Sequence, residues 1–325
     1  MTKRTRVFMA GSAAVMAAGL CTGLIAYYGG GLAALNASTG PTELAYVPVD
    51  ATVVAYADVR SIMDSELRKQ LKAAVPDIPD GQEEFKAKTG IDIESDLDYV
   101  VAAMTSLPGE NQMPNGLLVA RGSFNAGTLQ QLATDHGGTL EEYRGKTLIT
   151  SPADSAGNQV TLAFLEFGLV AVGKATVVKH AIDAQMSAQS VTGNDEMMNL
   201  VRDIAAQNNA WAVGRFDVLT SQANLPSEIS TRIPPVKWFA AAGHINGGVT
   251  GMLRAEARYE QSAQQLRDVV RGFLALAQMQ GQTDPKLTAL ANSLQLTGDG
   301  TTVALSFTLP AEFLALIAPK QPVPQ

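Results

Sequence analysis

Four carboxylates stand at alternate positions in the segment GIDIESDLDYV: Asp92, Glu94, Asp96 and Asp98. Such spacing is typical of calcium-binding loops, which also need a glycine at the sixth position and a bidentate carboxylate at the twelfth. Here the sixth and twelfth positions hold a leucine and an alanine. We therefore expect these acids to cap and solvate a short turn, and we predict neither a metal site nor a bound cofactor.

The three histidines, His136, His180 and His244, are isolated, because none lies within five residues of another or of a cysteine. That spacing fits no zinc motif. The sequence also lacks a Gly-x-Ser-x-Gly elbow, a Ser-x-x-Lys pair and the glycine-rich phosphate-binding loops. A Ser-His-Asp triad assembled only in the fold stays open. We predict no catalytic residues and, in consequence, a protein that is not an enzyme.

The residues best suited to binding an apolar ligand are aromatic. Trp238 and His244 share the same parity along an expected strand, so they lie on one face of it, and Trp211 belongs to another strand. Together with several methionines they could line an apolar pocket, although the same residue types fill ordinary cores. Trp211, Trp238 and His244 are therefore our candidate ligand-binding residues.

The distribution of charge excludes nucleic acid as a partner. The 325 residues carry a formal charge of −7, and the cations Lys3, Arg4 and Arg6 all precede the first acid, Glu43. Without these three, the chain has 21 basic and 31 acidic residues, a formal charge of −10. A surface this acidic gives no electrostatic attraction for a phosphate backbone.

Residues 1–37 are predicted to be a signal anchor. A basic leader precedes residues 7–28, which form an almost continuous apolar run. About 20 apolar residues are needed to span a bilayer, whereas a cleavable signal has an apolar region of about 7–15. The basic leader keeps the N-terminus in the cytoplasm. We therefore expect a single-pass protein of the inner membrane whose C-terminal domain is extracytoplasmic, in the periplasm.

Two alternatives concern processing. Small residues near Ala34 and Ala37 would permit cleavage there, which would release a secreted domain. Lipidation of Cys21 is disfavoured, because Leu20 stands where a lipobox needs a small residue. Cys21 is the only cysteine, so the exported domain has no internal disulfide.

Hydrophobic patterning beyond a tether at residues 38–44 predicts short strands interrupted by helices. Residues 53–59 alternate as a strand does, and residues 262–279 form the most amphipathic helix, with Leu266, Val270 and Phe273 on its apolar stripe. We expect that stripe to be buried against a sheet.

The order of strands and helices recurs along the chain, with VVAYADV matching WAVGRFDV. We therefore predict two degenerate repeats, residues 45–192 and 193–318, followed by a disordered proline-rich tail at 319–325. The expected fold class is α+β, with a largely antiparallel sheet and helices packed on one face, because several connections are too short for parallel crossovers.

The segments YVPVDATVVAYADV, FKAKTGIDIESDLDYVV and GGVTGMLRAEA resemble those of uncharacterised exported bacterial proteins, which carry a Pro- and Asp-led first strand and a "TGID…DL" segment. The resemblance covers most of residues 45–317. It implies export and the α+β architecture, and it implies no activity and no site residues.

These observations favour a non-enzymatic protein of the cell envelope, a membrane-tethered scaffold or partner-binding domain. The expected partners are the membrane, through residues 7–28, and an envelope protein or lipid. A carrier or sensor of an apolar ligand or lipid is the alternative, and an envelope hydrolase is the third.

Overall fold

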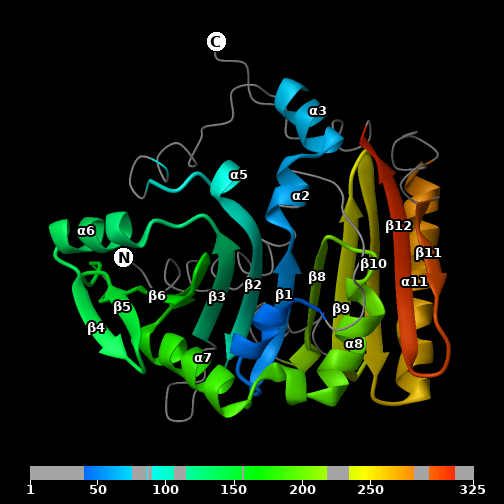
Figure 1. Cartoon of the computed structure of the whole chain (residues 1–325). Coiled ribbons are helices and arrows are strands. Elements are labelled where there is room, and N and C mark those ends of the chain that lie inside the picture. Colours follow the sequence, from blue (N-terminus) through cyan, green and yellow to red (C-terminus); the bar gives the residue numbers. More distant parts are fainter. Residues whose placement is uncertain are drawn as a thin grey trace.

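The computed structural model describes residues 40–74, 86, 90–105, 115–155, 157–217, 234–281 and 293–311. Its described strands form one antiparallel sheet in the order β11-β12-β10-β9-β8-β1-β2-β3-β7-β6-β5-β4 (Figure 1). The strands are β1 (Ala51–Ala57), β2 (Leu97–Thr105), β3 (Asn115–Gly122), β4 (Thr139–Tyr143), β5 (Lys146–Thr150), β6 (Thr161–Glu166), β7 (Leu169–Gly173), β8 (Ala210–Arg215), β9 (Val236–Ile245), β10 (Gly248–Ala257), β11 (Gln295–Thr297) and β12 (Thr302–Pro310).

Helices lie on both faces of this sheet and beyond one end of its strands (Figure 1). They are η1 (Thr42–Tyr46), α2 (Val59–Met63), α3 (Glu66–Ala74), α5 (Ile93–Asp96), α6 (Ala126–Asp135), α7 (Ala175–Ser187), η2 (Val191–Gly193), α8 (Asp195–Ala205) and α11 (Glu260–Gly281).

The pair β1 and β8 lies near the middle of the sheet, and Val54 lies opposite Val213 in it. Both side chains are fully buried, as β-branched residues in a central strand usually are. From this pair the meander β1-β2-β3 extends to one side and β8-β9-β10 to the other. On each side, a connection that contains a helix returns the chain to pair with the third strand, through β7 on β3 and β12 on β10.

The main core lies between one face of the sheet and the helices η1, α7 and α8. Val101, Leu117 and Val213 contribute from the strands, and Val178 and Val201 contribute from the helices. All five are at most 2% exposed. Full burial of one such side chain contributes about 1.5–3 kcal/mol, so this face supplies much of the stability of the fold.

Helix α11 packs on the opposite face, so the expectation that all helices share one face is wrong. Its residue Ala263 contacts Ala257 and Val303, whereas Met252 of β10 packs against the main core. Successive residues of a strand point to opposite faces, and Ala257 and Met252 differ in parity. Figure 1 agrees, with α8 in front of the sheet and α11 behind it.

The predicted burial of Phe273 is also wrong, because this side chain is 67% exposed. The contact line of α11 runs through Ala263, Leu266, Val270 and Leu274, which are all buried or half-buried. Phe273 is displaced from Leu274 by about 100° around the helix axis. The sequence indicated an amphipathic helix correctly, but the apolar stripe is wider than the surface that the sheet offers.

The α+β class and the antiparallel sheet are thus as expected. The predicted signal anchor at 1–37 and the tail at 319–325 lie outside the described residues. In the described part, no helix combines the length and the apolar character needed to cross a membrane. The boundary expected between residues 192 and 193 falls within η2.

Candidate functional site

Glu43 is the one charged residue among the described residues that is buried, with 2% of its surface exposed. It lies in η1, which is held in the main core by Leu44 and Val47, themselves 1% and 0% exposed. Removing a carboxylate from water is costly unless the charge is paired and hydrogen-bonded. The environment of Glu43 therefore has to supply several donors.

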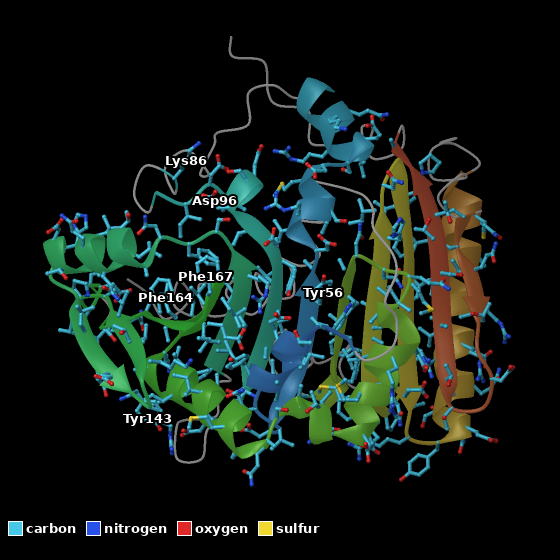
Figure 2. The ribbon with its side chains drawn as sticks, in the orientation of Figure 1. Tyr56, Lys86, Asp96, Tyr143, Phe164 and Phe167 are labelled. Carbon is cyan, nitrogen blue, oxygen red and sulfur yellow. The ribbon has the colours of Figure 1, made fainter. Side chains whose placement is uncertain are left out.

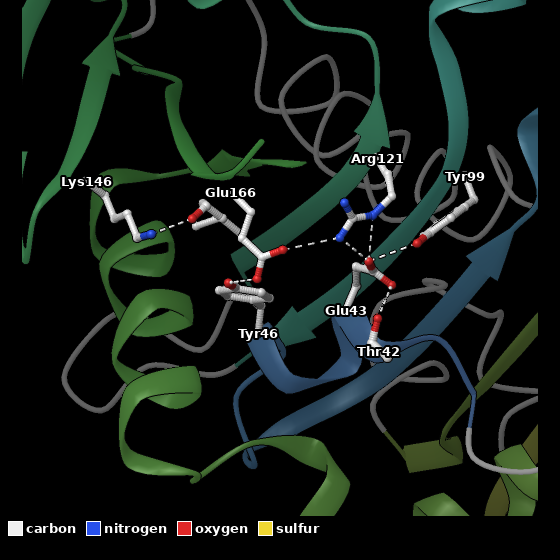
Figure 3. Close-up of polar contacts among 8 residues, drawn as sticks. Thr42, Glu43, Tyr46, Tyr99, Arg121, Lys146 and Glu166 are labelled. Atoms are coloured by element: carbon white, nitrogen blue, oxygen red, sulfur yellow. Dashed lines mark hydrogen bonds and ion pairs between the residues drawn. The ribbon is translucent and has the colours of Figure 1, made fainter. Parts of the chain in front are cut away.

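Three side chains donate to this carboxylate (Figure 3). Arg121 donates through Nε at 2.8 Å and also pairs through Nη2 at 2.6 Å. The Tyr99 hydroxyl donates to the same oxygen at 2.8 Å, and Thr42 donates to the other oxygen at 3.3 Å. Tyr99 of β2 and Arg121 of β3 are direct partners in the sheet register, which places both side chains on the face that η1 covers.

A second, more exposed carboxylate extends this arrangement. Glu166, at the end of β6, accepts a hydrogen bond from the Tyr46 hydroxyl at 2.8 Å and one from Arg121 Nη2 at 3.5 Å. The guanidinium therefore joins two acids that are far apart in the sequence. We call Thr42, Glu43, Tyr46, Tyr99, Arg121 and Glu166 the Glu43 cluster.

The cluster stabilises neutral tyrosines and a charged arginine. Burial and the hydrogen bond to Glu43 raise the pKa of Tyr99 to about 12. Burial and the contact with Glu166 raise the pKa of Tyr46 further. Burial alone would lower the pKa of Arg121, but the Glu43 carboxylate outweighs it and raises that pKa. At neutral pH the two tyrosines therefore keep their protons and Arg121 keeps its charge, and all three donate to the carboxylates of Glu43 and Glu166.

The chemistry open to the Glu43 cluster is mainly structural. Both oxygens of Glu43 accept hydrogen bonds from neighbouring side chains, and neither tyrosine has a pKa lowered toward neutrality, as an acid–base catalyst would need. The arrangement fastens η1 to β2, β3 and β6.

The second polar site is a hollow of about 340 Å³ beside the main core. It lies where α8 begins, β8 and β10 end, and α11 starts. Its lining includes Trp238, which is 7% exposed, and the exposed side chains of Arg258 and Tyr259. We call it the Trp238 hollow. Its volume is within the range of about 300–1,000 Å³ that small-molecule sites occupy.

The candidate ligand-binding residues do not converge on one cavity. Trp238 lines the hollow, but Trp211 is 2% exposed and its ring stacks on Tyr56 at 5.6 Å between centroids. His244 lies six residues from Trp238 on β9, which separates them by about 20 Å along the strand. Strand parity puts Trp238 and His244 on one face of β9, but it does not show how far apart they lie along the strand.

One of the alternating acids, Asp92, caps a short helix as expected, whereas the ion pairs that these acids form were not predicted. Asp92 caps α5, accepting from the Glu94 backbone N–H at 3.0 Å, and its pKa is lowered by Lys86, which donates to it at 2.7 Å. Asp98 pairs instead with Arg60 at 2.6 Å. Figure 2 shows Lys86 and Asp96, the last residue of α5, beyond the upper ends of the strands. Within the described ranges, no group of three such residues is placed to hold a metal ion.

Sequence reasoning did not find the Glu43 cluster. Glu43, Arg121 and Glu166 come from three separate segments, and no local motif marks them. The available signal was modest: Glu43 is the first acid of the chain and is directly followed by apolar residues. The strand order β3-β7-β6 brings Arg121 of β3 near Glu166 of β6. Glu43 reaches them from η1, which packs on the same face of the sheet.

Comparisons with known proteins give a distant structural likeness. No family model matches the chain, and no curated protein matches it. Among solved structures, crystal form I of TP0453 is similar, with 12% sequence identity and a TM-score of 0.44 over 87% of this chain and 97% of that one. At that level the likeness transfers no function.

Proposed function

We propose that this protein is a non-enzymatic component of the cell envelope, in which a membrane-tethered extracytoplasmic domain acts as a scaffold or binds an envelope partner. The observation that supports this most directly is the Glu43 cluster. It fastens residues 42–46 to the sheet, and these residues overlap the end of the predicted tether. The cluster therefore makes the end of the predicted tether part of the folded domain.

The backbone just before η1 supports the same proposal. Gly40 has a φ of +75°, and a β-carbon there would lie 2.8 Å from Leu44 Cδ1 and 3.2 Å from Val201 Cγ1. Both the left-handed conformation and the close approach favour glycine. At Gly40 the chain is therefore already packed against α8.

Other polar clusters favour a scaffold over a hydrolase, because their groups are committed to one another. The Tyr143 hydroxyl donates to Asp183 at 2.8 Å. Arg254 pairs with both Asp203 at 2.8 Å and Glu256 at 2.7 Å. Such pairs contribute to packing and orientation. None of them joins a nucleophile to an adjacent base, which is the usual sign of covalent catalysis.

The two-repeat architecture is part of the proposal. The meanders β1-β2-β3 and β8-β9-β10 are each followed by a helix, α6 and α11. Later strands then extend the sheet, β4 to β7 on one side and β11 and β12 on the other. If residues 53–59 and 212–218 are equivalent, Val54 corresponds to Val213, and these two residues lie opposite each other in the sheet. A local two-fold axis between β1 and β8 would produce that pairing.

Topology is tested first, with reporters fused after Gln325 of the full chain. A reporter that works only outside the cytoplasm should be active, because the basic leader fixes the orientation. The protein should also stay in the membrane after carbonate washing. A mature protein that begins near residue 38 and washes off would replace the anchor with a cleaved signal.

Function is tested by crosslinking the full chain in its own membrane and comparing it with Arg121→Met. A partner recovered in stoichiometric amount with the native chain, and less with the variant at equal membrane level, supports the proposal. The variant is compared at a temperature at which it stays folded. Lipid that co-purifies in stoichiometric amount, without a protein partner, would support the ligand carrier instead.

A further inference from the structure

The chain contains two Asn-Gly dipeptides, and the structure places them in different surroundings. Asn115, which precedes Gly116, begins β3, is 4% exposed and lies opposite Thr105 of β2. Asn246 and Gly247 form the turn between β9 and β10, where the asparagine is half-buried and the glycine is exposed. The same dipeptide therefore occurs once within the sheet and once at the tip of a hairpin.

An asparagine that precedes a glycine can react with its own main chain. The nitrogen of the next peptide attacks the side-chain carbonyl carbon, and the side-chain nitrogen leaves as ammonia together with the amide proton, which closes a succinimide ring. Water then opens the ring at either carbonyl and gives aspartate or isoaspartate. The rate of such an intramolecular attack depends on whether the two atoms can approach to about 3–3.5 Å in the right orientation.

At Asn246 the groups that must react are free to move. Among the described residues, neither its side-chain amide nor the Gly247 N–H has a hydrogen-bond partner, and the turn is closed instead by the Asn246 N–H on the Gly248 carbonyl at 3.0 Å. A β-carbon on Gly247 would meet no atom within 4 Å, so nothing packs over the attacking nitrogen. Gly116, by contrast, is paired with Met104 in the sheet, so rotation of its peptide would disrupt the ladder.

The Asn246 carbonyl also connects this turn to α3. It accepts a hydrogen bond from the Leu67 backbone N–H at 3.0 Å. The Leu67 side chain is 1% exposed and belongs to the same apolar cluster as Ile245 and Val249, which flank the turn. In isoaspartate the main chain runs through the side-chain carbonyl, and the former main-chain carbonyl becomes a free carboxylate. That product therefore lengthens the turn and changes the acceptor on which the start of α3 rests.

We infer that Asn246 is a site of spontaneous deamidation, through a succinimide formed with the Gly247 nitrogen, and that the isoaspartyl product weakens the attachment of α3 to the β9–β10 turn. The co-reactant is water, and the reaction needs no enzyme. This inference goes beyond the scaffold proposal and does not rest on it, because the turn and α3 lie outside the Glu43 cluster.

The chemical step is tested by incubating the full chain in detergent at neutral and at mildly alkaline pH. Digestion with pepsin in acid then stops the reaction, and mass spectrometry of the peptides measures conversion at each asparagine. We expect conversion at Asn246, faster at alkaline pH because a base must remove the amide proton. Asn115 in the same sample should convert at least about tenfold more slowly, because its peptide cannot rotate into the attacking geometry.

Gly247→Ala is the matched variant. The backbone at Gly247 is not left-handed and the space around it is open, so alanine fits the turn while its methyl group shields the nitrogen. Conversion of Asn246 in this variant should be slower by about tenfold or more. Equal conversion of Asn246 and Asn115, or equal conversion of Asn246 with and without the methyl group, would overturn the assignment.

The effect on α3 is tested by hydrogen exchange of the peptide that contains Leu67. After conversion this peptide should exchange about fivefold faster, since one hydrogen bond that holds the start of the helix is weakened. Asn246→Asp carries the charge of the product without the longer main chain, so its α3 should exchange like that of the fresh native chain. Unchanged exchange after conversion, or an equal increase in incubated Gly247→Ala, would overturn the link between the turn and α3.

Discussion

Arg121 reaches Glu43 through two nitrogens, Nε at 2.8 Å and Nη2 at 2.6 Å, although 78 residues separate them in the sequence. The two side chains differ in environment, since that of Glu43 is 1% exposed and that of Arg121 is 29% exposed. Loss of either partner therefore has unequal consequences. Without Arg121, the remaining charge is buried, whereas without Glu43 the guanidinium still meets solvent and Glu166.

Arg121→Met is expected to lower the free energy of unfolding by about 3–5 kcal/mol, because it leaves the Glu43 carboxylate buried without its main partner. Glu43→Leu combined with Arg121→Met should recover most of that loss, since neither charge then remains. Urea denaturation followed by tryptophan fluorescence measures both. As a control, Arg271→Met breaks an exposed pair with Asp268 and should cost less than about 0.5 kcal/mol. Equal effects of Arg121→Met and Arg271→Met would contradict the role of the cluster.

Alkaline pH should weaken the fold through Tyr99. Its pKa is raised to about 12 by burial and by Glu43, against about 10 in an unfolded chain. The folded state therefore keeps a proton that the unfolded state releases, so the stabilisation is complete below pH 10 and is lost as the pH rises through 12.

Tyr99→Phe should remove one late-titrating group from the ultraviolet absorbance titration of the folded protein. It should also reduce the dependence of stability on pH above 10. Tyr259→Phe alters an exposed ring with no described hydrogen bond, so it serves as the matched control and should leave the alkaline transition in place. If Tyr99→Phe lost a group that titrates near pH 10 and kept all the late-titrating groups, Tyr99 would be shown to ionise without hindrance in the folded protein.

Local patterns predicted the elements of this fold well where one face of an element is apolar. The alternation in residues 53–59 corresponds to β1. The amphipathic stretch at 262–279 corresponds to α11. These results follow from the periods of 2 and 3.6 residues, which depend only on neighbours in the sequence.

Strand order, helix side and polar pairing could not be predicted in the same way. Nothing local shows that β7 pairs with β3, or that α11 packs on the face opposite α8. Glu43 has the sequence context of a solvated acid in a first helical turn, yet it is buried because Arg121 and Tyr99 arrive from other strands. The site residues depend on such long-range placement, whereas the elements depend on local pattern.

The contact line of α11 gives a direct comparison within one helix. Leu266→Ala should lower the free energy of unfolding by about 1–2 kcal/mol, because this half-buried side chain packs against Ala257 and Val303. Phe273→Ala should cost less than about 0.5 kcal/mol, because the ring is 67% exposed. Urea denaturation of the two variants measures both losses in the free energy of unfolding. A larger cost for Phe273→Ala would mean that the apolar stripe is covered after all.

A single methyl group at the end of α7 stores removable strain. Ala188 caps this helix with φ 54° and ψ 25°, and its backbone N–H bonds to the Ala184 carbonyl. An L-residue in this left-handed conformation costs about 1–2 kcal/mol, and glycine, the usual residue at such a position, avoids that cost. Ala188 is exposed, so its methyl group contributes little packing in return.

Ala188→Gly is therefore expected to raise the free energy of unfolding by about 0.5–1 kcal/mol. This gain is the relief of backbone strain minus the cost of the larger conformational entropy that glycine gives the unfolded chain. The melting temperature of the full chain, followed by circular dichroism, should rise accordingly. The matched control is Ala184→Gly, one turn earlier, where the residue is 2% exposed and helical. There the same change should lower stability by about 1 kcal/mol or more, through lost helix propensity and a lost buried methyl group. Two variants that both destabilise the protein would show that the left-handed cap at Ala188 carries no strain.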